Sequence, residues 1–234
     1  MVEHDLLVIT GATARILDKP GRPDLFTDAE KDRMSRLRRP QDRDDFLAAH
    51  LLVRTCAARL IGLATEEISI VQRCRTCGGP HGRPEIVGHP GVRASLAHSR
   101  GVVAAAAGRM PVGVDVEAVP AAGGPTADEL SVALTPGEIA AIETAADSGR
   151  SLLLAWTRKE ACLKAGLVDL EGLHRFDLSN LGSDVPGEHL TPRSTSLGSG
   201  RLGRWTVHDW WDAATGAVGT VVAPAGAALT LAGP

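Results

Sequence analysis

The sequence predicts a mixed α+β protein that has helices and short strands in both halves of the chain. Apolar residues recur at helical spacing over residues 41–61 and 151–165, whereas residues 67–74 and 112–119 show the alternation and β-branching of strands. Only 3% of the 234 residues are aromatic and tyrosine is absent. We therefore expect a core built mainly from Leu, Val, Ile and Ala.

Composition and charge exclude several classes of protein. The 25 basic and 28 acidic side chains give a net charge of −3, which provides no general attraction to nucleic acid or to an anionic membrane. No apolar run approaches the roughly 20 residues that span a bilayer, and the N-terminus lacks a basic segment typical of secretory signals. Four cysteines in a chain of this length do not resemble a disulfide framework. We expect a cytoplasmic protein with reduced thiols.

Local signals define the elements of the first half. Thr27 followed by Glu30 forms a capping-box pattern, which opens a charged surface helix over 27–39. A long amphipathic helix follows Pro40 and ends at Gly62. The other expected elements are a strand over 5–17, a strand over 67–74, a Gly/Pro-rich loop over 75–84, and strands within 93–119 that are joined by a turn at Arg100 and Gly101.

The second half begins with a linker over 120–130, which is rich in Gly, Ala and Pro. A helix opens after Thr135, with Pro136 at its first position. A second helix over 151–165 is stopped by Gly166, and residues 203–224 are expected to form a hairpin.

Asp115 and Glu117 are the first candidate site. Side chains of a strand alternate between its faces, so these two carboxylates point the same way, about 7 Å apart. A divalent cation would relieve their repulsion, and oxygen-only ligands suit magnesium. The alternative is a strand end with its acidic face in water.

Glu160 and Lys164 lie one turn apart on the expected helix and share a face with Trp156. They form either an ordinary ion pair worth about 0.3 kcal/mol beside a packed tryptophan, or part of a site. Glu160 becomes a candidate metal ligand only if it meets Asp115 and Glu117.

Each of the other candidate sites has both a functional and a structural interpretation. His98 could donate to a phosphate or satisfy a turn. Cys74, Cys77 and His81 follow a C-x2-C-x3-H pattern, which supplies three zinc-type ligands where a closed structural site needs four. A small zinc-stabilised interaction module and a plain Gly/Pro loop are the two interpretations. A clamp for phosphate or a solubilising surface could be formed by the basic residues Lys31, Arg33, Arg36, Arg38, Arg39 and Arg43.

Four segments taken in order, "HGRP", "SLAHSRG", "VGVDVEAV" and "WTRKEACLKA", resemble the surfactin-type (Sfp-like) 4′-phosphopantetheinyl transferases. The specific feature is G-x-D-x-E followed some forty residues later by W-x-x-K-E-x-x-x-K. The resemblance extends from about residue 30 to 180. That family transfers the phosphopantetheine arm of coenzyme A to a serine of an apo acyl or peptidyl carrier protein and releases 3′,5′-ADP.

The resemblance implies two similar α+β halves related by a pseudo-twofold, with the active site in the cleft between them. The N-terminal half, 1–112, would serve the 3′-phosphate and adenine, and the C-terminal half, 113–234, the metal and the chemistry. It also implies a monomer that uses magnesium, with manganese as an alternative. Its partners would be coenzyme A and a carrier protein, without nucleic acid or membrane.

Residue roles follow from the same resemblance. Asp115, Glu117 and Glu160 would surround the metal, and Glu160 would be the base that deprotonates the carrier serine. Lys164 would face the pyrophosphate and His98 a phosphate. The remaining implied coenzyme A contacts are Arg33, Arg36, Arg43, Arg83, Pro84 and Lys159.

Asp45 stands where the family often has Arg or Lys. The 3′-phosphate contact would therefore fall to Arg33, Arg36 or Arg43. A non-catalytic coenzyme A or nucleotide-binding protein is the alternative function.

Overall fold

A computed structural model describes most of the chain as two compact units. Unit 1 comprises Met1–Val112 and Ala227–Pro234, and unit 2 comprises Gly113–Gly226. None of the helices in the described part of the chain combines the length and apolar character needed to cross a bilayer. The described residues are 5–18, 25–74, 77–120, 126–182, 191–195 and 205–233, with the backbone alone at 127 and 191–195.

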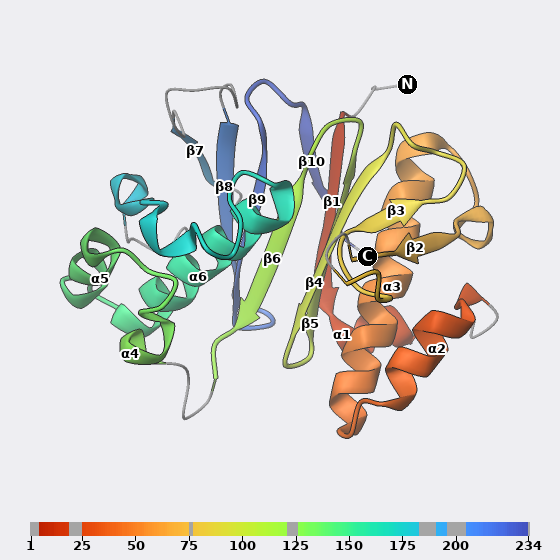
Figure 1. The fold of residues 1–234 in the computed structure, drawn as a ribbon, viewed down its shortest axis with the longest axis horizontal. Coiled ribbons are helices and arrows are strands. Elements are labelled where there is room, and N and C mark those ends of the chain that lie inside the picture. The colour runs from red at the N-terminus through yellow and green to blue at the C-terminus, as the bar shows by residue number, and fades with distance from the viewer. Residues whose placement is uncertain are drawn as a thin grey trace. The chain divides into compact units, whose positions relative to one another are not determined.

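Unit 1 is built on a six-stranded sheet with the order β10-β1-β5-β4-β3-β2 (Figure 1). β1 pairs antiparallel with β5 over its whole length, from Leu6 opposite Gly108 to Ala12 opposite Val102. β10 pairs with the other edge of β1 in parallel. The strands are β1 (Leu6–Ala12), β2 (Ile70–Gln72), β3 (Pro84–Ile86), β4 (Arg93–Ser99), β5 (Val102–Gly108) and β10 (Leu229–Ala232).

The last strand thus lies in unit 1, although residues 113–234 were expected to form one half. An unpaired edge of β1 would leave a row of backbone donors and acceptors without partners. Residues 229–232 supply those partners, with Leu6 opposite Leu229 and Ile9 opposite Ala232. Strand pairing between residues so far apart leaves no local signal in the sequence.

α3 (Pro40–Ile61) packs along this sheet and confirms the long helix expected there (Figure 1). Pro40 occupies its first turn, and Gly62 ends it with a left-handed φ of 75°. Ala49, Val53 and Cys56 of its buried face share a core cluster with alternate residues of β5, such as Val103 and Ala105. The small side chains on both elements allow a close approach of helix and sheet.

The first strand is shorter than expected, because α1 (Thr13–Leu17) begins directly after Ala12. The change of direction depends on Asp45 of α3. Its Oδ1 accepts a hydrogen bond from Thr13 Oγ1 at 2.5 Å, and its Oδ2 accepts one from the Gly101 amide at 3.0 Å. These partners are distant in sequence, so the pattern of residues 5–17 alone could not reveal the boundary.

α2 (Asp28–Ser35) carries the expected capping box between Thr27 and Glu30. Most of its residues are exposed, as expected of a charged surface helix, but Glu30 is buried. Between β4 and β5, the turn at Arg100 and Gly101 is confirmed, with positive φ values of 47° and 90°.

Unit 2 contains a four-stranded antiparallel sheet with the order β6-β9-β8-β7. The hairpin expected over 203–224 is confirmed as β8 (Trp205–Asp212) and β9 (Ala217–Pro224). α6 packs against β6 and β9 (Figure 1). The remaining elements are α4 (Ala127–Leu130), α5 (Pro136–Glu143), α6 (Ser148–Ala165), β6 (Gly113–Ala118), β7 (Thr191–Thr195) and 3-10 turns over Thr65–Glu67, Leu173–Arg175 and Ser179–Leu181.

The helix ends in unit 2 follow the expected local signals. Thr135 caps α5, and Gly166 ends α6 with a left-handed φ of 88°. The expected linker differs at its end, because Thr126 caps the short helix α4. Residues 121–125 of that linker lie outside the described residues.

Candidate active site

The facing surfaces of β6 and α6 carry the candidate site of unit 2. At Gly113 the two elements almost touch, since a Cβ built there would lie 1.9 Å from the Ala161 carbonyl oxygen of α6. The Cβ direction of Gly113 therefore points at α6. Asp115 and Glu117 share this face because side chains alternate along a strand. The expectation that both carboxylates point the same way rests on this alternation, and Gly113 identifies α6 as the element that this face meets.

Asp115 is a buried carboxylate that is only partly satisfied. Its side chain is 7% exposed, and its Oδ1 accepts a hydrogen bond from Lys164 Nζ at 2.6 Å. Its Oδ2 is buried and has no hydrogen-bond partner among the described residues. Burial raises the pKa of Asp115, and the ammonium of Lys164 only partly opposes the shift. The site therefore favours a further positive charge at Oδ2.

Glu160 lies one turn before Lys164 on α6 and is partly buried. Burial raises the pKa of Glu160, the negative charge of Asp115 raises it further, and Lys164 lowers it. The carboxylates of Asp115 and Glu160 are thus electrostatically coupled across the interface of β6 and α6. Lys164 forms an ion pair with Asp115. The spacing along the helix had suggested an i, i+4 ion pair with Glu160 instead.

A buried polar network that the sequence did not reveal holds α6 on the sheet. The guanidinium of Arg158 donates twice to Asp209 Oδ2, at 3.1 and 2.7 Å, and once to the Gly182 carbonyl at 2.6 Å. Thr220 bridges the network, donating to Asp209 Oδ1 at 2.8 Å and contacting the Thr157 hydroxyl at 3.1 Å. Thr220 is also the cross-strand partner of Asp115. This network therefore links α6 to the strand residue that pairs with Asp115.

Lys159 has a different environment from Lys164. Its ammonium is fully buried, forms an ion pair with Glu138 Oε2 at 2.9 Å, and donates to the carbonyl oxygens of Leu173 and Phe176. These contacts join α5 and the segment after α6 to the helix. The expected role of Lys159 in coenzyme A binding therefore has no support from its contacts.

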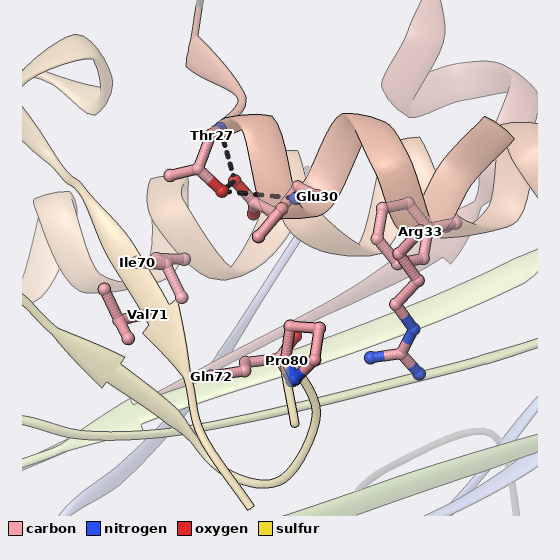
Figure 2. A pocket seen from close by; sticks show the side chains of 9 residues that line it. Thr27, Glu30, Arg33, Ile70, Val71, Gln72 and Pro80 are labelled. Carbon is pink, nitrogen blue, oxygen red and sulfur yellow. Dashed lines mark hydrogen bonds between the residues drawn. The ribbon is translucent and has the colours of Figure 1, made fainter. Parts of the chain in front are cut away.

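Unit 1 contains a separate pocket of about 130 Å³ beside α2 (Figure 2). Arg33, from the expected phosphate-binding set, lies on this pocket, with its guanidinium carbon 5.6 Å from the centre of the Phe46 ring. Figure 2 shows that the Arg33 side chain leaves α2 on the side of the helix that faces Pro80. The lining residues are Thr27, Ala29, Glu30, Arg33, Phe46, Ile70, Val71, Gln72 and Pro80.

Glu30 connects this pocket to a buried network in α3. Its Oε1 lies 2.8 Å from His50 Nδ1, and its Oε2 accepts a hydrogen bond from Arg54 at 2.7 Å. Burial alone would raise the pKa of Glu30, but the hydrogen bonds from His50 and Arg54 outweigh it and leave the pKa far below its usual range. Burial lowers the pKa of His50, although its contact with Glu30 opposes the shift.

The other expected ligand residues of unit 1 have mainly exposed positions. Arg36 forms an ion pair with Asp32 at 2.6 Å, and Arg43 donates to the Leu37 carbonyl at 2.7 Å. Arg83 and His98 are exposed, before β3 and near the end of β4. Pro84 is the buried first residue of β3.

Comparison with known proteins bears on the β6–α6 site directly. Residues 111–210 match the family model of the 4′-phosphopantetheinyl transferase superfamily. A curated protein of Synechocystis sp. (strain ATCC 27184 / PCC 6803 / Kazusa), provisionally named a 4′-phosphopantetheinyl transferase, is 26% identical over 195 residues. The alignment covers 80% of this chain and 72% of that protein.

The segment that matches the 4′-phosphopantetheinyl transferase superfamily contains Asp115, Glu117, Glu160 and Lys164. It also contains both partners of the buried Arg158–Asp209 pair. The pocket beside α2 lies outside the matched segment but within the N-terminal part of the chain.

Proposed function

We propose that this protein is a surfactin-type 4′-phosphopantetheinyl transferase. It would transfer the phosphopantetheine arm of coenzyme A to a serine of an apo acyl or peptidyl carrier protein and release 3′,5′-ADP. The observation that carries the proposal is the coupled pair of carboxylates, Asp115 on β6 and Glu160 on α6, inside the segment that matches the superfamily. The similarity to the Synechocystis protein also supports it.

The chemistry of the donor set suits a divalent cation. Asp115, Glu117 and Glu160 offer only oxygen ligands, which suit magnesium, with manganese as an alternative. Asp115 Oδ2 is buried without a hydrogen-bond partner among the described residues, and the pKa of both Asp115 and Glu160 is raised. A nearby cation favours the ionised carboxylates and would relieve both features. When bound, the ion would neutralise charge on the pyrophosphate.

Glu160 and Lys164 would perform the protein's part of the chemistry. A serine hydroxyl is a poor nucleophile at neutral pH, so a base must take its proton. With a cation beside it, Glu160 would be ionised at neutral pH, which is the form that can accept the serine proton. Lys164 is only partly buried, and its ammonium could move from Asp115 to an oxygen of the pyrophosphate. That movement would stabilise the negative charge that develops on the leaving group.

Unit 1 would bind the 3′,5′-ADP end of coenzyme A. We assign the 3′-phosphate contact to Arg33, because Arg33 lines the pocket of unit 1. A guanidinium suits a phosphate monoester. His98 would contact a phosphate, Arg83 and Pro84 would lie near the adenine, and Arg36 and Arg43 would add positive charge. We further propose that the two units are related by a pseudo-twofold and that the protein acts as a monomer.

The decisive experiment incubates the protein with coenzyme A, magnesium and an apo carrier protein, followed by mass spectrometry of the carrier. The carrier should gain the mass of one phosphopantetheine arm. Glu160→Gln should reduce the rate by at least a hundredfold while coenzyme A binding changes little, because it removes the base but keeps the shape. Glu171→Gln, an exposed residue of the same unit, is the matched control.

If the wild-type protein leaves several apo carriers unmodified, the proposal fails. Tight binding of coenzyme A without transfer would instead support the alternative of a non-catalytic binding protein. Transfer by Glu160→Gln at the wild-type rate would remove Glu160 from the role of base.

A second arm of the same assay tests Arg33 with dephospho-coenzyme A, which lacks the 3′-phosphate. Arg33→Ala should raise the KM for coenzyme A about tenfold or more and leave the KM for dephospho-coenzyme A nearly unchanged, since a charged hydrogen bond contributes about 1.5–3 kcal/mol. Lys31→Ala removes an exposed charge from the same helix and should affect neither substrate. An equal rise with both substrates would assign Arg33 another role.

A further inference from the structure

The loop between β2 and β3 gathers two thiols and one imidazole. Ligand atoms of Cys74, Cys77 and His81 all lie within 4.8 Å of one another. Cys77 Sγ and His81 Nε2 lie 3.0 Å apart. Sulfur and imidazole nitrogen are donors that zinc prefers, in contrast to the carboxylates of unit 2.

The backbone of the loop holds this convergence in place. The Cys74 amide donates to the Gly79 carbonyl, and the Gly78 amide donates to the Cys74 carbonyl, both at 2.9 Å. The Gly79 amide also donates to Cys77 Sγ at 3.4 Å. This hydrogen bond helps to fix the position of the Cys77 sulfur beside His81.

Two glycines keep the loop in this conformation. Gly78 has a left-handed φ of 71°, which favours glycine. A Cβ at Gly79 would lie 3.2 Å from the His81 ring and 3.3 Å from Cys77 Sγ, so a side chain there would press against the converging atoms. Glycine at positions 78 and 79 therefore leaves room beside the ligand atoms of Cys77 and His81.

We propose that Cys74, Cys77 and His81 bind one zinc ion, with a water molecule as the fourth ligand. Tetrahedral zinc separates a thiolate sulfur from an imidazole nitrogen by about 3.6 Å, so the present contact must open by about half an ångström. Cys77 and His81 are exposed side chains that can make this adjustment and admit the ion. Three protein ligands and a water molecule complete the coordination number that zinc prefers.

The ion would also stabilise the pocket of unit 1. Pro80 lines that pocket and lies between Cys77 and His81 in the chain. A metal held by residues before and after Pro80 in the chain would fix the position of Pro80 in the pocket wall. The metal-binding proposal itself does not depend on the transferase activity.

The test is a cobalt titration of the reduced, chelator-treated full-length protein, followed by displacement with zinc. Cobalt reports thiolate ligands through a charge-transfer band and tetrahedral geometry through intense visible bands. We expect about one equivalent to bind. Cys74→Ser, Cys77→Ser and His81→Ala should each weaken binding at least tenfold, whereas His89→Ala, a partly exposed histidine of the β3–β4 loop, should bind like the wild type.

Two results would overturn the zinc site. One is uptake of less than about a tenth of an equivalent of metal by the wild type. The other is equal affinity of the wild type and the three ligand variants. Circular dichroism checks that His81→Ala, which alters an exposed side chain, remains folded. Added azide should shift the visible bands by replacing water, and an unchanged spectrum would contradict the water ligand.

Discussion

Lys159 and Lys164 lie on the same helix, but their surroundings give them different capacities. The side chain of Lys159 is 0% exposed and contacts three oxygen acceptors. The side chain of Lys164 is 28% exposed, and its ammonium donates to one oxygen of Asp115. Withdrawing the Lys159 ammonium would leave Glu138 as an uncompensated buried charge, whereas Lys164 can exchange partners at the surface. Lys164 is therefore the better candidate for contact with an anionic substrate.

Glu30 makes the stability of unit 1 sensitive to acid. In the folded state the pKa of Glu30 is far below its usual range, and the pKa of His50 is also lowered. The folded protein then binds fewer protons than the unfolded chain in acid, so the free energy of unfolding falls as the pH falls. The loss begins near the ordinary histidine pKa of about 6.5 and continues through the ordinary glutamate pKa of about 4.3.

We expect Glu30→Gln to lower the free energy of unfolding of unit 1 at pH 7 by about 3–5 kcal/mol, because Arg54 would remain buried without its charged partner. The variant should also lose the part of the pH dependence that lies below about pH 5. Urea denaturation with pulsed hydrogen exchange of α3 peptides measures both. Glu85→Gln, on an exposed position of β3, should retain the wild-type profile. If the stability of Glu30→Gln fell with pH as steeply as that of the wild type, Glu30 would not be the source of the acid sensitivity.

At the scale of elements, the close approach of α6 to β6 depends on one glycine. Gly113 places the Ala161 carbonyl and the Ala165 amide where a Cβ would stand, at 1.9 and 2.5 Å. Because both contacts are to backbone atoms, no side-chain rotation can relieve them. Asp115 follows two residues later, so any separation of the two elements also changes the distance between Asp115 and Lys164.

Gly113→Ala should therefore destabilise unit 2 by more than about 3 kcal/mol, as overpacking against backbone does in the worst cases. Unfolding can be followed by tryptophan fluorescence, since all four tryptophans lie between residues 156 and 211. Gly149→Ala in the first turn of α6 is the control. A Cβ there meets ordinary contacts, so this change should stabilise by up to about 1 kcal/mol. Equal stability of Gly113→Ala and the wild type would show that the close contact can relax.

Elements with local signals were predictable from the sequence, and elements defined by distant partners were not. The capping residues Thr27 and Thr135 and the terminal glycines Gly62 and Gly166 act within one turn of chain, so their patterns sufficed. The end of β1 depends on Asp45, and the short strands β3 and β10 depend on pairing across the sheet. The end of β1 and these two short strands therefore have no local sequence pattern that would predict them.

Some features of the candidate site were likewise predictable from local sequence, and others were not. Strand alternation and helical spacing indicated that Asp115 and Glu117 share a face and that Glu160 and Lys164 lie one turn apart. The burial of Asp115 and its pairing with Lys164 depend on how α6 packs, which the spacing could not supply. The Arg158–Asp209 pair was missed because its partners are far apart in sequence.

At the scale of the whole molecule, unit 1 is assembled from two separate segments of chain. β10 completes its sheet against β1, and apolar residues on both strands face each other in register. Deleting residues 229–234 should raise the hydrogen-exchange rate of β1 amides at least tenfold, because the strand edge loses its partner. Deleting residues 233–234 alone keeps β10 and should leave these rates unchanged. Equal protection in both deletions would mean that β10 contributes nothing to the stability of the sheet.

The placement of β10 also affects how the protein is made. On a ribosome the chain emerges from its N-terminus, so β1 and β5 are available long before residues 229–232. All of unit 2 must be synthesised in the interval, and throughout it the outer edge of β1 has no partner from its own sheet. An open apolar strand edge invites pairing with other nascent chains. Translation speed and chaperone access are therefore expected to influence the yield of folded protein more strongly than they would for a chain whose first unit closes on itself.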